Sequence, residues 1–425
     1  MVVGSVIGSA IFMMPAIVAP YGGLGLVSLG AAAVGALMVA LTFADLSRRV
    51  AHVGGPYAYA RAGFGDFAGF LMAWGYWIAI WTACAAITIA FTAYLGALIP
   101  QVRENPTLSV GAGLLLVWGL VAINIRGVRE VAIVGLVTTV LKLLPLAFIG
   151  AVGLFFVESS TLPPMNPTAD GSLFVFASTF ALTFWTFTGM EGVTVPTEDV
   201  INPEKTIPRA LILGTLTVGV IYLLVTFAVM GLVPATELAV SPSPLTEAGV
   251  RIAGSWAGVF VSVGALISTL GALNYAILIA GQTAMAAARD GVFPHRFQRL
   301  TRYHTPGFSF IAAGLLTSVL LIMNYTKGMV GAYRFVLLIA TVTIVVPYAF
   351  AAMAALVLEM SDRAAGRTRR LREGVVAVLA FLVCMWVIAS SGAETVYWGF
   401  LLLMAGIPVY VVVTRDRHKK GGDAS

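Results

Sequence analysis

Two ionisable residues lie deep inside apolar stretches of this 425-residue chain, and they are the first candidates for chemistry. Lys142 follows Arg129 by about 13 residues, or roughly 20 Å along a helix. Glu191 closes the run Trp-Thr-Phe-Thr-Gly-Met-Glu. A charge at the centre of a bilayer costs about 2.5–3.5 kcal/mol on insertion scales, so each group should face the protein interior and have a partner.

Each of these groups has two interpretations. Glu191 is either a buried carboxyl that ties its helix to neighbouring helices, or a gate or proton site. Lys142 is either a fixed cation that donates to the carbonyls of a broken helix, or a coupling group. As a coupling group it would carry a proton or take the place of a bound sodium ion.

Two apolar segments contain small residues and a proline that should interrupt a helix. The first has Gly4, Gly8 and Pro15, and the second has residues 183–192 with Pro196 beyond them. An unwound helix exposes N–H groups that can hold a carboxylate and carbonyls that can hold an ammonium group. Interrupted segments at matching positions in two halves of a chain point to a transporter binding site. The alternative is that the small residues only allow close helix packing.

The sequence gives little support for enzymatic, cofactor or metal chemistry. The four histidines, His52, His295, His304 and His418, all fall in predicted loops, and Cys84 and Cys384 lie in apolar runs. Two cysteines cannot form a disulfide scaffold or a cysteine zinc site. We see no nucleophile–base pair, phosphate-binding glycine loop or flavin motif, so we expect no enzyme, no cofactor and no metal site.

The composition identifies the environment that must position these residues. The chain is 59% hydrophobic and 10% charged, against about 45–50% and 25% in soluble domains. Runs of about 20 apolar residues cross a bilayer as helices, which satisfy their backbone groups internally. We predict an all-α polytopic membrane protein with twelve spans, near 2–20, 24–44, 67–99, 107–124, 131–157, 172–195, 210–233, 253–288, 308–324, 335–358, 374–392 and 395–414.

The distribution of positive charge supports this count and predicts the orientation. The loops after even-numbered spans, with the C-terminus, hold 20 of the 25 Lys and Arg residues, and the opposite loops hold four. Basic residues mark the cytoplasmic side, so both termini are predicted to be cytoplasmic. The net charge of +6 is therefore a signal facing anionic lipid, and nucleic acid is not an expected partner. Because Met1 is followed directly by apolar sequence, we expect the chain to begin inside its first helix.

Five sequence stretches, in order, resemble a known family. They are residues 8–12, 54–61, 184–191, 202–209 and 281–294, which include Gly-Ser-Ala-Ile-Phe and Gly-Gly-Pro-Tyr. With the twelve spans, they make the whole chain resemble the amino acid–polyamine–organocation superfamily. Within it the chain resembles the bacterial basic amino acid/polyamine antiporters. The resemblance implies a leucine-transporter-type fold with inverted repeats in residues 1–157 and 158–360, followed by two C-terminal helices and a basic tail in 361–425.

The resemblance also implies a binding site. A substrate carboxylate would rest on the amides near Gly8, Ser9 and Ala10, and its amino group would be held near Trp185 and Thr188. Trp185 would close over the substrate, and Tyr76, Glu191 and Tyr348 would form a gate toward the cytoplasm. The full set of substrate-binding residues that we carry over is Val6, Gly8, Ser9, Ala10, Ala79, Ile80, Cys84, Trp185, Thr188 and Ala276.

The residues expected to select a substrate depart from the arginine/agmatine exchangers. Cys84 stands where those proteins have an asparagine, Ala276 where they have a tryptophan, and Ala10 where they have a second glycine. Losing the tryptophan removes a cation–π contact of about 0.5–2 kcal/mol, and a thiol bonds more weakly than an amide. These changes argue against a guanidinium and favour a neutral or differently shaped amino acid. Lys142 resembles a lysine of sodium-independent branches.

The resulting prediction is a sodium-independent secondary transporter of amino acids or amine derivatives, in the bacterial cytoplasmic membrane. Antiport follows from the likeness to antiporters, and a proton-coupled neutral amino acid permease or exporter is the alternative. A channel would need repeated polar stripes or charged rings, and a structural membrane protein would not need paired broken helices. The expected partners are a small-molecule substrate, protons and the lipid bilayer, with a second copy of the chain as a further option.

Overall fold

The computed structural model describes residues 6–50, 55–127, 140–194, 202–324, 329–364 and 371–422. Within these ranges every regular element is a helix, which confirms the predicted all-α class. The sequence features at Met1, Gly4, Gly54 and Pro196 lie outside the described residues.

The predicted spans are found as nine long helical segments and three shorter ones within the described ranges. The long ones comprise α3 (Gly23–Arg49), α5 (Asp66–Leu98), α7 (Pro106–Arg126), α9 (Ser172–Phe184) with the turns that follow it, α10 (Pro203–Leu232), α13 (Ser255–Arg289), α15 (Met329–Ala364), α16 (Leu371–Ser390), and α17 (Ala393–Met404) with α18 (Gly406–Gly422). The shorter ones are α2 (Ala10–Val18) with its last turn, the helical stretch Val140–Phe156, and α14 (Gly307–Asn324). All nine long segments are apolar enough to cross a membrane.

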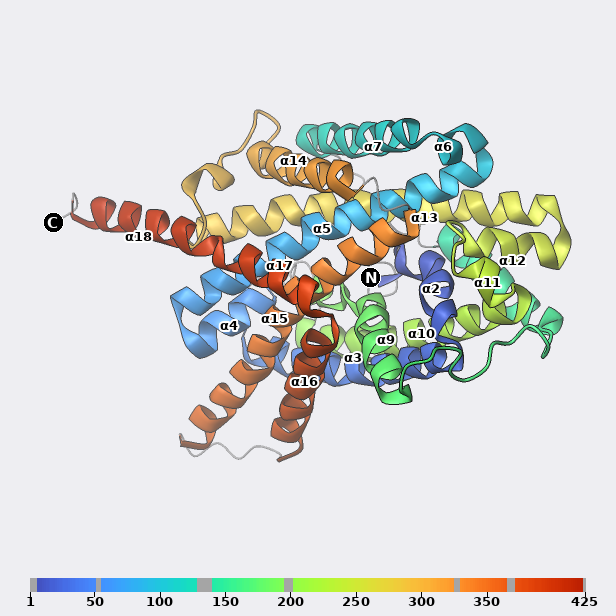
Figure 1. The fold of residues 1–425 in the computed structure, drawn as a ribbon. Helices are drawn as coiled ribbons and strands as arrows, with labels where there is room; N and C mark the ends of the chain where they lie inside the picture. Colours follow the sequence, from blue (N-terminus) through green and yellow to red (C-terminus); the bar gives the residue numbers. More distant parts are fainter. Residues whose placement is uncertain are drawn as a thin grey trace.

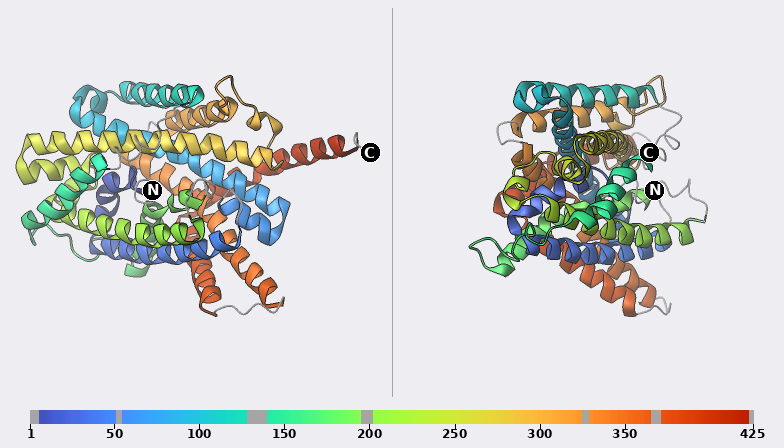
Figure 2. Two further views of the ribbon diagram at one scale, coloured as in Figure 1. Left: turned by 180° about the vertical axis from the view of Figure 1, so that it is seen from behind. Right: turned by 90° about the vertical axis from the view of Figure 1, so that its right-hand side faces the viewer.

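Short helices cover the two ends of the bundle. α4 (Pro56–Phe64), the loop after α13 and the end of α18 lie at one end. α6 (Pro100–Glu104), α11 (Ala235–Leu238) and α12 (Pro244–Ala253) lie at the other (Figures 1 and 2). The connections between these spans therefore alternate between the two ends of the bundle, as expected for the predicted order of spans. Which end faces the cytoplasm stays a prediction.

The most buried of the long helices, α5 and α15, form the centre of the bundle. α5 has 33 residues and α13 has 35, about 50 Å each at 1.5 Å per residue, which agrees with the extra length predicted for spans 3 and 8. α5 packs against α13 and α15, while α3 packs against α9 and α10 (Figure 1). In α5 and α15 78% of the apolar window is buried, against 22% in the α17–α18 segment, so α17 and α18 are peripheral.

Helix ends carry the expected local signals. Asn105 caps α7, because its side-chain oxygen accepts from the backbone N–H groups of Thr107 and Leu108. α4 and α5 meet at Gly65, whose φ of 84° is in the region that glycine adopts without steric cost. This tight corner fixes α4 across the end of α5, and the two helices pack together.

Candidate functional site

The first apolar helix is interrupted at residues 7–9, and regular helix α2 begins after them. Two buried side chains donate hydrogen bonds to carbonyls at this break. Tyr222 on α10 donates to the carbonyl oxygen of Val6 at 3.0 Å, and Lys142 Nζ donates to that of Ile7 at 2.6 Å. Lys142 therefore does what one of its two interpretations requires, since it holds a carbonyl of a broken helix.

The other side of this break is the N-terminal end of α2. Ser9 is the N-cap residue, but its hydroxyl lies 3.3 Å from the Tyr333 hydroxyl and does not cap the helix. Tyr333 in turn lies beside the indole of Trp185. Gly8, Ser9 and Ala10 all line a cavity. The first amides of a helix carry partial positive charge, so this end suits an anionic group such as a carboxylate.

The second predicted interruption is also present. α9 ends at Phe184, a single 3₁₀ turn covers Trp185–Phe187, and a second short turn covers Met190–Thr194. Gly189 between these turns has a φ of 94°, a conformation that side chains rarely allow. Thr188 donates its hydroxyl to the carbonyl of Trp185 at 2.8 Å, which ties the unwound segment to itself.

Glu191 lies at this second break, where two tyrosines from distant helices meet it. Tyr76 of α5 donates to Oε1 at 3.1 Å, while Tyr348 of α15 and the backbone N–H of Gly189 (3.0 Å) donate to Oε2. The structure thus brings together the three predicted gate residues. The partners of the Glu191 carboxylate are hydrogen-bond donors. In the described ranges, no three His, Cys, Asp or Glu side chains are grouped to hold a metal ion.

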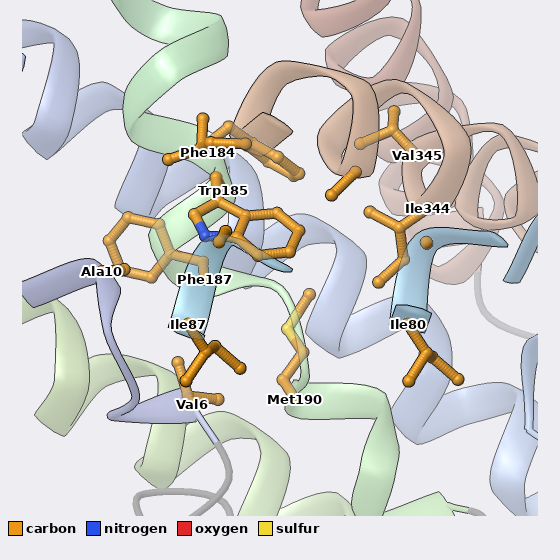
Figure 3. Close-up of a cluster of buried hydrophobic side chains, with 14 of the residues drawn as sticks. Val6, Ala10, Ile80, Ile87, Phe184, Trp185, Phe187, Met190, Ile344 and Val345 are labelled. Atoms are coloured by element: carbon orange, nitrogen blue, oxygen red, sulfur yellow. The ribbon is translucent and has the colours of Figure 1, made fainter. Parts of the chain in front are cut away.

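A cavity of about 110 Å³ lies between the two breaks. Its lining comes from the first break, the second break, α5, α13 and α15. Figure 3 shows part of this region, with Ile80, Ile87 and Ile344 gathered around Trp185. Trp185 itself is only 8% exposed, so the indole is packed into the protein and forms part of the wall.

Most of the predicted binding residues line this cavity. They are Val6, Gly8, Ser9, Ala10, Ala79, Ile80, Trp185, Thr188 and Ala276, together with Tyr76 and Glu191 from the gate. Tyr348 is fully buried and reaches the site through Glu191. Cys84 is buried outside this lining. Its place on the substrate-binding set stays a prediction.

Sequence reasoning missed several residues of the lining. On α5 the helical spacing from Tyr76 leads through Ile80 to Ala83 and Ile87, which share one face, whereas Cys84 lies beyond Ile80 at the edge of that face, about 80° from Tyr76. The same period on α13 joins the predicted Ala276 to residues that were not predicted, namely Ala272, Tyr275 and Ile279. Counting three or four residues at a time along α5 and α13 from the predicted site residues would have identified these lining residues.

A larger cavity of about 570 Å³ lies elsewhere, between α5, α7, the loop after α11 and the start of α15. Arg103 and the hydroxyl residues Thr88, Thr92 and Ser109 are among its lining residues, and none of the described residues that line it is acidic. None of the predicted site residues borders it, so size alone does not select the functional site.

Two of the sequence stretches that carry the family resemblance meet at one end of the bundle. Tyr57 on α4 donates to Asp290 Oδ2 at 2.9 Å, just after α13. Arg61 lies 3.8 Å from the same carboxylate and bonds Asp66 at 2.7 Å. Burial and the neighbouring Asp290 raise the pKa of Tyr57 well above its usual value, so it is a neutral donor at physiological pH.

Comparison with known proteins finds similarity along nearly the whole chain. Residues 1–413 match the family described as amino acid permease. The arginine/ornithine antiporter of Pseudomonas aeruginosa is 30% identical, over 99% of this chain and 90% of that protein. The putative arginine/ornithine antiporter of Bacillus subtilis is 28% identical over 99% and 96%, and the arginine/agmatine antiporter of Chlamydia felis is 27% identical over 100% and 89%.

Proposed function

The chain belongs to the amino acid permease family, and we propose that it exchanges amino acids across the bacterial cytoplasmic membrane by alternating access. The observation that carries this proposal is the cavity that lies between two interrupted helices, with amides on one side and a buried carboxylate on the other. Antiport is the mode named for the relatives from Pseudomonas aeruginosa and Chlamydia felis.

The polar groups of the cavity suit the two ends of an α-amino acid. The substrate carboxylate would accept hydrogen bonds from the first amides of α2, near Gly8 and Ala10. The ammonium group would be held by carbonyls of the unwound segment around Trp185 and Thr188. These are backbone groups, so they recognise what all amino acids share.

The gate would be the hydrogen-bonded group formed by Tyr76, Glu191 and Tyr348. It joins α5, the second break and α15, so opening a path at this point requires these three elements to separate. The indole ring of Trp185 would cover the bound substrate. Each full cycle would then alternate between a state with this group intact and one with it broken.

Lys142 would replace a coupling cation. Its ammonium group already lies on the Ile7 carbonyl, where a bound sodium ion would otherwise stabilise the broken helix. Transport would therefore proceed without sodium. Glu191 and Lys142 are also the buried groups that could carry a proton, which keeps a proton-coupled permease as the second candidate.

The remaining parts of the proposal concern placement. Both termini would be cytoplasmic, with α4 and the loop after α13 on that side, because the basic residues collect there. Residues 1–157 and 158–360 would form the two inverted repeats, each with an interrupted first helix. The protein would work with or without pairing into a homodimer, since the cavity is built from one chain.

The test is exchange in liposomes that contain the purified full-length protein. Radiolabelled amino acids and polyamines are offered in sodium-free buffer at two pH values, with vesicles either empty or preloaded with unlabelled substrate. We expect uptake only into preloaded vesicles. Uptake into empty vesicles under an inward proton gradient would instead establish the proton-coupled permease, and no uptake of any amino acid or amine would refute both.

A further inference from the structure

The carboxylate of the cavity is already engaged by the protein. Oε1 of Glu191 accepts from Tyr76, and Oε2 accepts from Tyr348 and from the Gly189 amide. A carboxylate offers about four acceptor positions, so these donors take up most of its capacity. A basic side chain on the substrate would find at most one acceptor position left on Glu191, and a bidentate contact would displace a tyrosine of the proposed gate.

The rest of the lining offers a cation no charged partner. Among the described residues that line the cavity, Glu191 is the one charged side chain. Apart from Tyr76 and Tyr275, the walls from α5 and α13 are aliphatic, and they include Ala79, Ile80, Ala83, Ile87, Ala276 and Ile279. A guanidinium or ammonium side chain placed against this surface would lose its hydration without an ionic partner, which is strongly unfavourable.

Tyr275 limits the space further. It lines the cavity from α13, and a Cβ atom placed on Gly192 would lie only 2.8 Å from its hydroxyl oxygen. The side chain therefore reaches across from α13 to the backbone of the second break, beside Glu191. Gly192 permits this approach because it has no side chain, and the ring occupies space that a long substrate side chain would need.

We propose that the side-chain half of this cavity selects a neutral amino acid with a short aliphatic side chain, and that Tyr275 sets the length limit. The proposal rests on the function proposed above, because it specifies the substrate of that same site. It separates this chain from the relatives named as arginine/ornithine and arginine/agmatine antiporters, although they share its fold family.

The experiment measures binding and exchange side by side. The purified protein is unfolded thermally with alanine, valine, leucine, arginine, ornithine or agmatine, since a ligand that binds the folded state raises the unfolding temperature. The same compounds compete for exchange in liposomes. We expect a short aliphatic amino acid to compete on the order of a hundredfold better than arginine or ornithine, because the latter bury an unpaired charge.

Two outcomes would overturn the inference in distinguishable ways. If arginine, ornithine or agmatine stabilises the protein and exchanges best, the substrate class is wrong while the transport function stands. If none of the amino acids or amines stabilises the protein and none is exchanged, the proposed function fails as well, and the inference fails with it.

Variants of the lining give an independent check. Tyr275→Ala should improve competition by amino acids with longer aliphatic side chains, roughly tenfold for each one or two added methylene groups. Tyr275→Phe keeps the ring and should leave this preference unchanged. Ala276→Asp should improve competition by ornithine, whereas its uncharged counterpart Ala276→Asn should not. An unchanged length preference in Tyr275→Ala would remove Tyr275 from the proposal, and equal effects of Asp and Asn would contradict the role given to charge.

Discussion

The two interrupted helices are stabilised in opposite ways. At the first break the protein supplies donors, Lys142 and Tyr222, to carbonyls that have left the helix. At the second break it supplies an acceptor, Glu191, to the amide of Gly189. This difference indicates which backbone groups remain available to bind a substrate. The protein satisfies the carbonyls of Val6 and Ile7 at the first break, so the amides there are the groups proposed to bind a substrate carboxylate. At the second break the Trp185 carbonyl already accepts from Thr188, so a substrate ammonium group would share that carbonyl or use a neighbouring one.

We propose that the first break holds a permanent contact and the second a switchable one. Lys142 reaches the first break from one neighbouring helix, whereas Glu191 joins α5 and α15 through two tyrosines. Moving either α5 or α15 away breaks the second arrangement, whereas the Lys142 and Tyr222 contacts at the first break come from other helices. We therefore expect substitutions at Glu191 to affect the transport cycle most, and substitutions at Lys142 to affect the folded state as well.

The largest expected effect follows the replacement Glu191→Gln. Glutamine keeps the shape, but it is uncharged and its NH₂ group must face one of the donors that now bond the carboxylate. Hydrogen bonds to a charged group contribute about 1.5–3 kcal/mol each, so we expect exchange to fall by roughly thirtyfold or more while the protein still folds. Exchange is measured from pH 5 to 8 in liposomes.

The controls for this variant are Tyr76→Phe and Tyr348→Phe, each of which removes one donor and retains the carboxylate. They should reduce exchange less than Glu191→Gln and preserve its pH dependence. If Glu191→Gln transports normally across the whole pH range, Glu191 is a structural carboxyl and the second break is as permanent as the first.

The next effect is expected at the first break, from Lys142→Met. The substitution preserves much of the apolar stem and removes the charged donor to Ile7, and a hydrogen bond from a charged group contributes about 1.5–3 kcal/mol. We expect a lower unfolding temperature and roughly tenfold slower exchange. Tyr222→Phe is the matched control, because it removes a neutral donor from the adjacent carbonyl, at about 0.5–1.5 kcal/mol. Equal losses in the two variants would show that the charge of Lys142 has no special role.

A comparable effect, confined to substrate affinity, is expected for Trp185→Ala, which tests whether the second break contributes to ligand binding. The indole lines the cavity, and aromatic contacts contribute about 0.5–1.5 kcal/mol beyond area burial. We expect substrate affinity to fall about tenfold, measured by competition. Phe187 lies in the same turn but packs on Tyr222, with ring centroids 5.9 Å apart. Phe187→Ala should therefore lower stability and leave affinity nearly unchanged, and the reverse pattern would move the site away from Trp185.

The sequence was informative about both breaks for a simple physical reason. Ionisable groups are so unfavourable within apolar spans that Glu191 and Lys142 stand out without any structure. The glycines and prolines of the two segments stand out because they can interrupt a helix and lie at matching positions in the two halves of the chain. The alternation of basic loops likewise predicted the number and order of helices, and the apolar helices of the structure agree.

The aliphatic walls could not be recognised in the same way. Ala83, Ile87 and Ile279 are chemically identical to the many residues that face lipid or pack between helices, so composition does not mark them. What distinguishes them is the rotation of α5 and α13, which depends on packing. Tyr275 was overlooked because the resemblance directed attention to Ala276, its neighbour on the same helix.

The smallest expected effect concerns the backbone of the second break. Gly189 has a φ of 94°, so Gly189→Ala should cost about 1–2 kcal/mol and displace the amide that bonds Glu191. Thermal unfolding measures the loss, and exchange reports whether the gate still closes. Gly111 on α7 is the control, because nothing lies within 4 Å of an added Cβ there, and Gly111→Ala should be neutral or slightly stabilising. If Gly189→Ala lowers stability but leaves exchange unchanged, the amide at this break supports the fold alone, and the switchable part of the site reduces to the two tyrosines that hold Glu191.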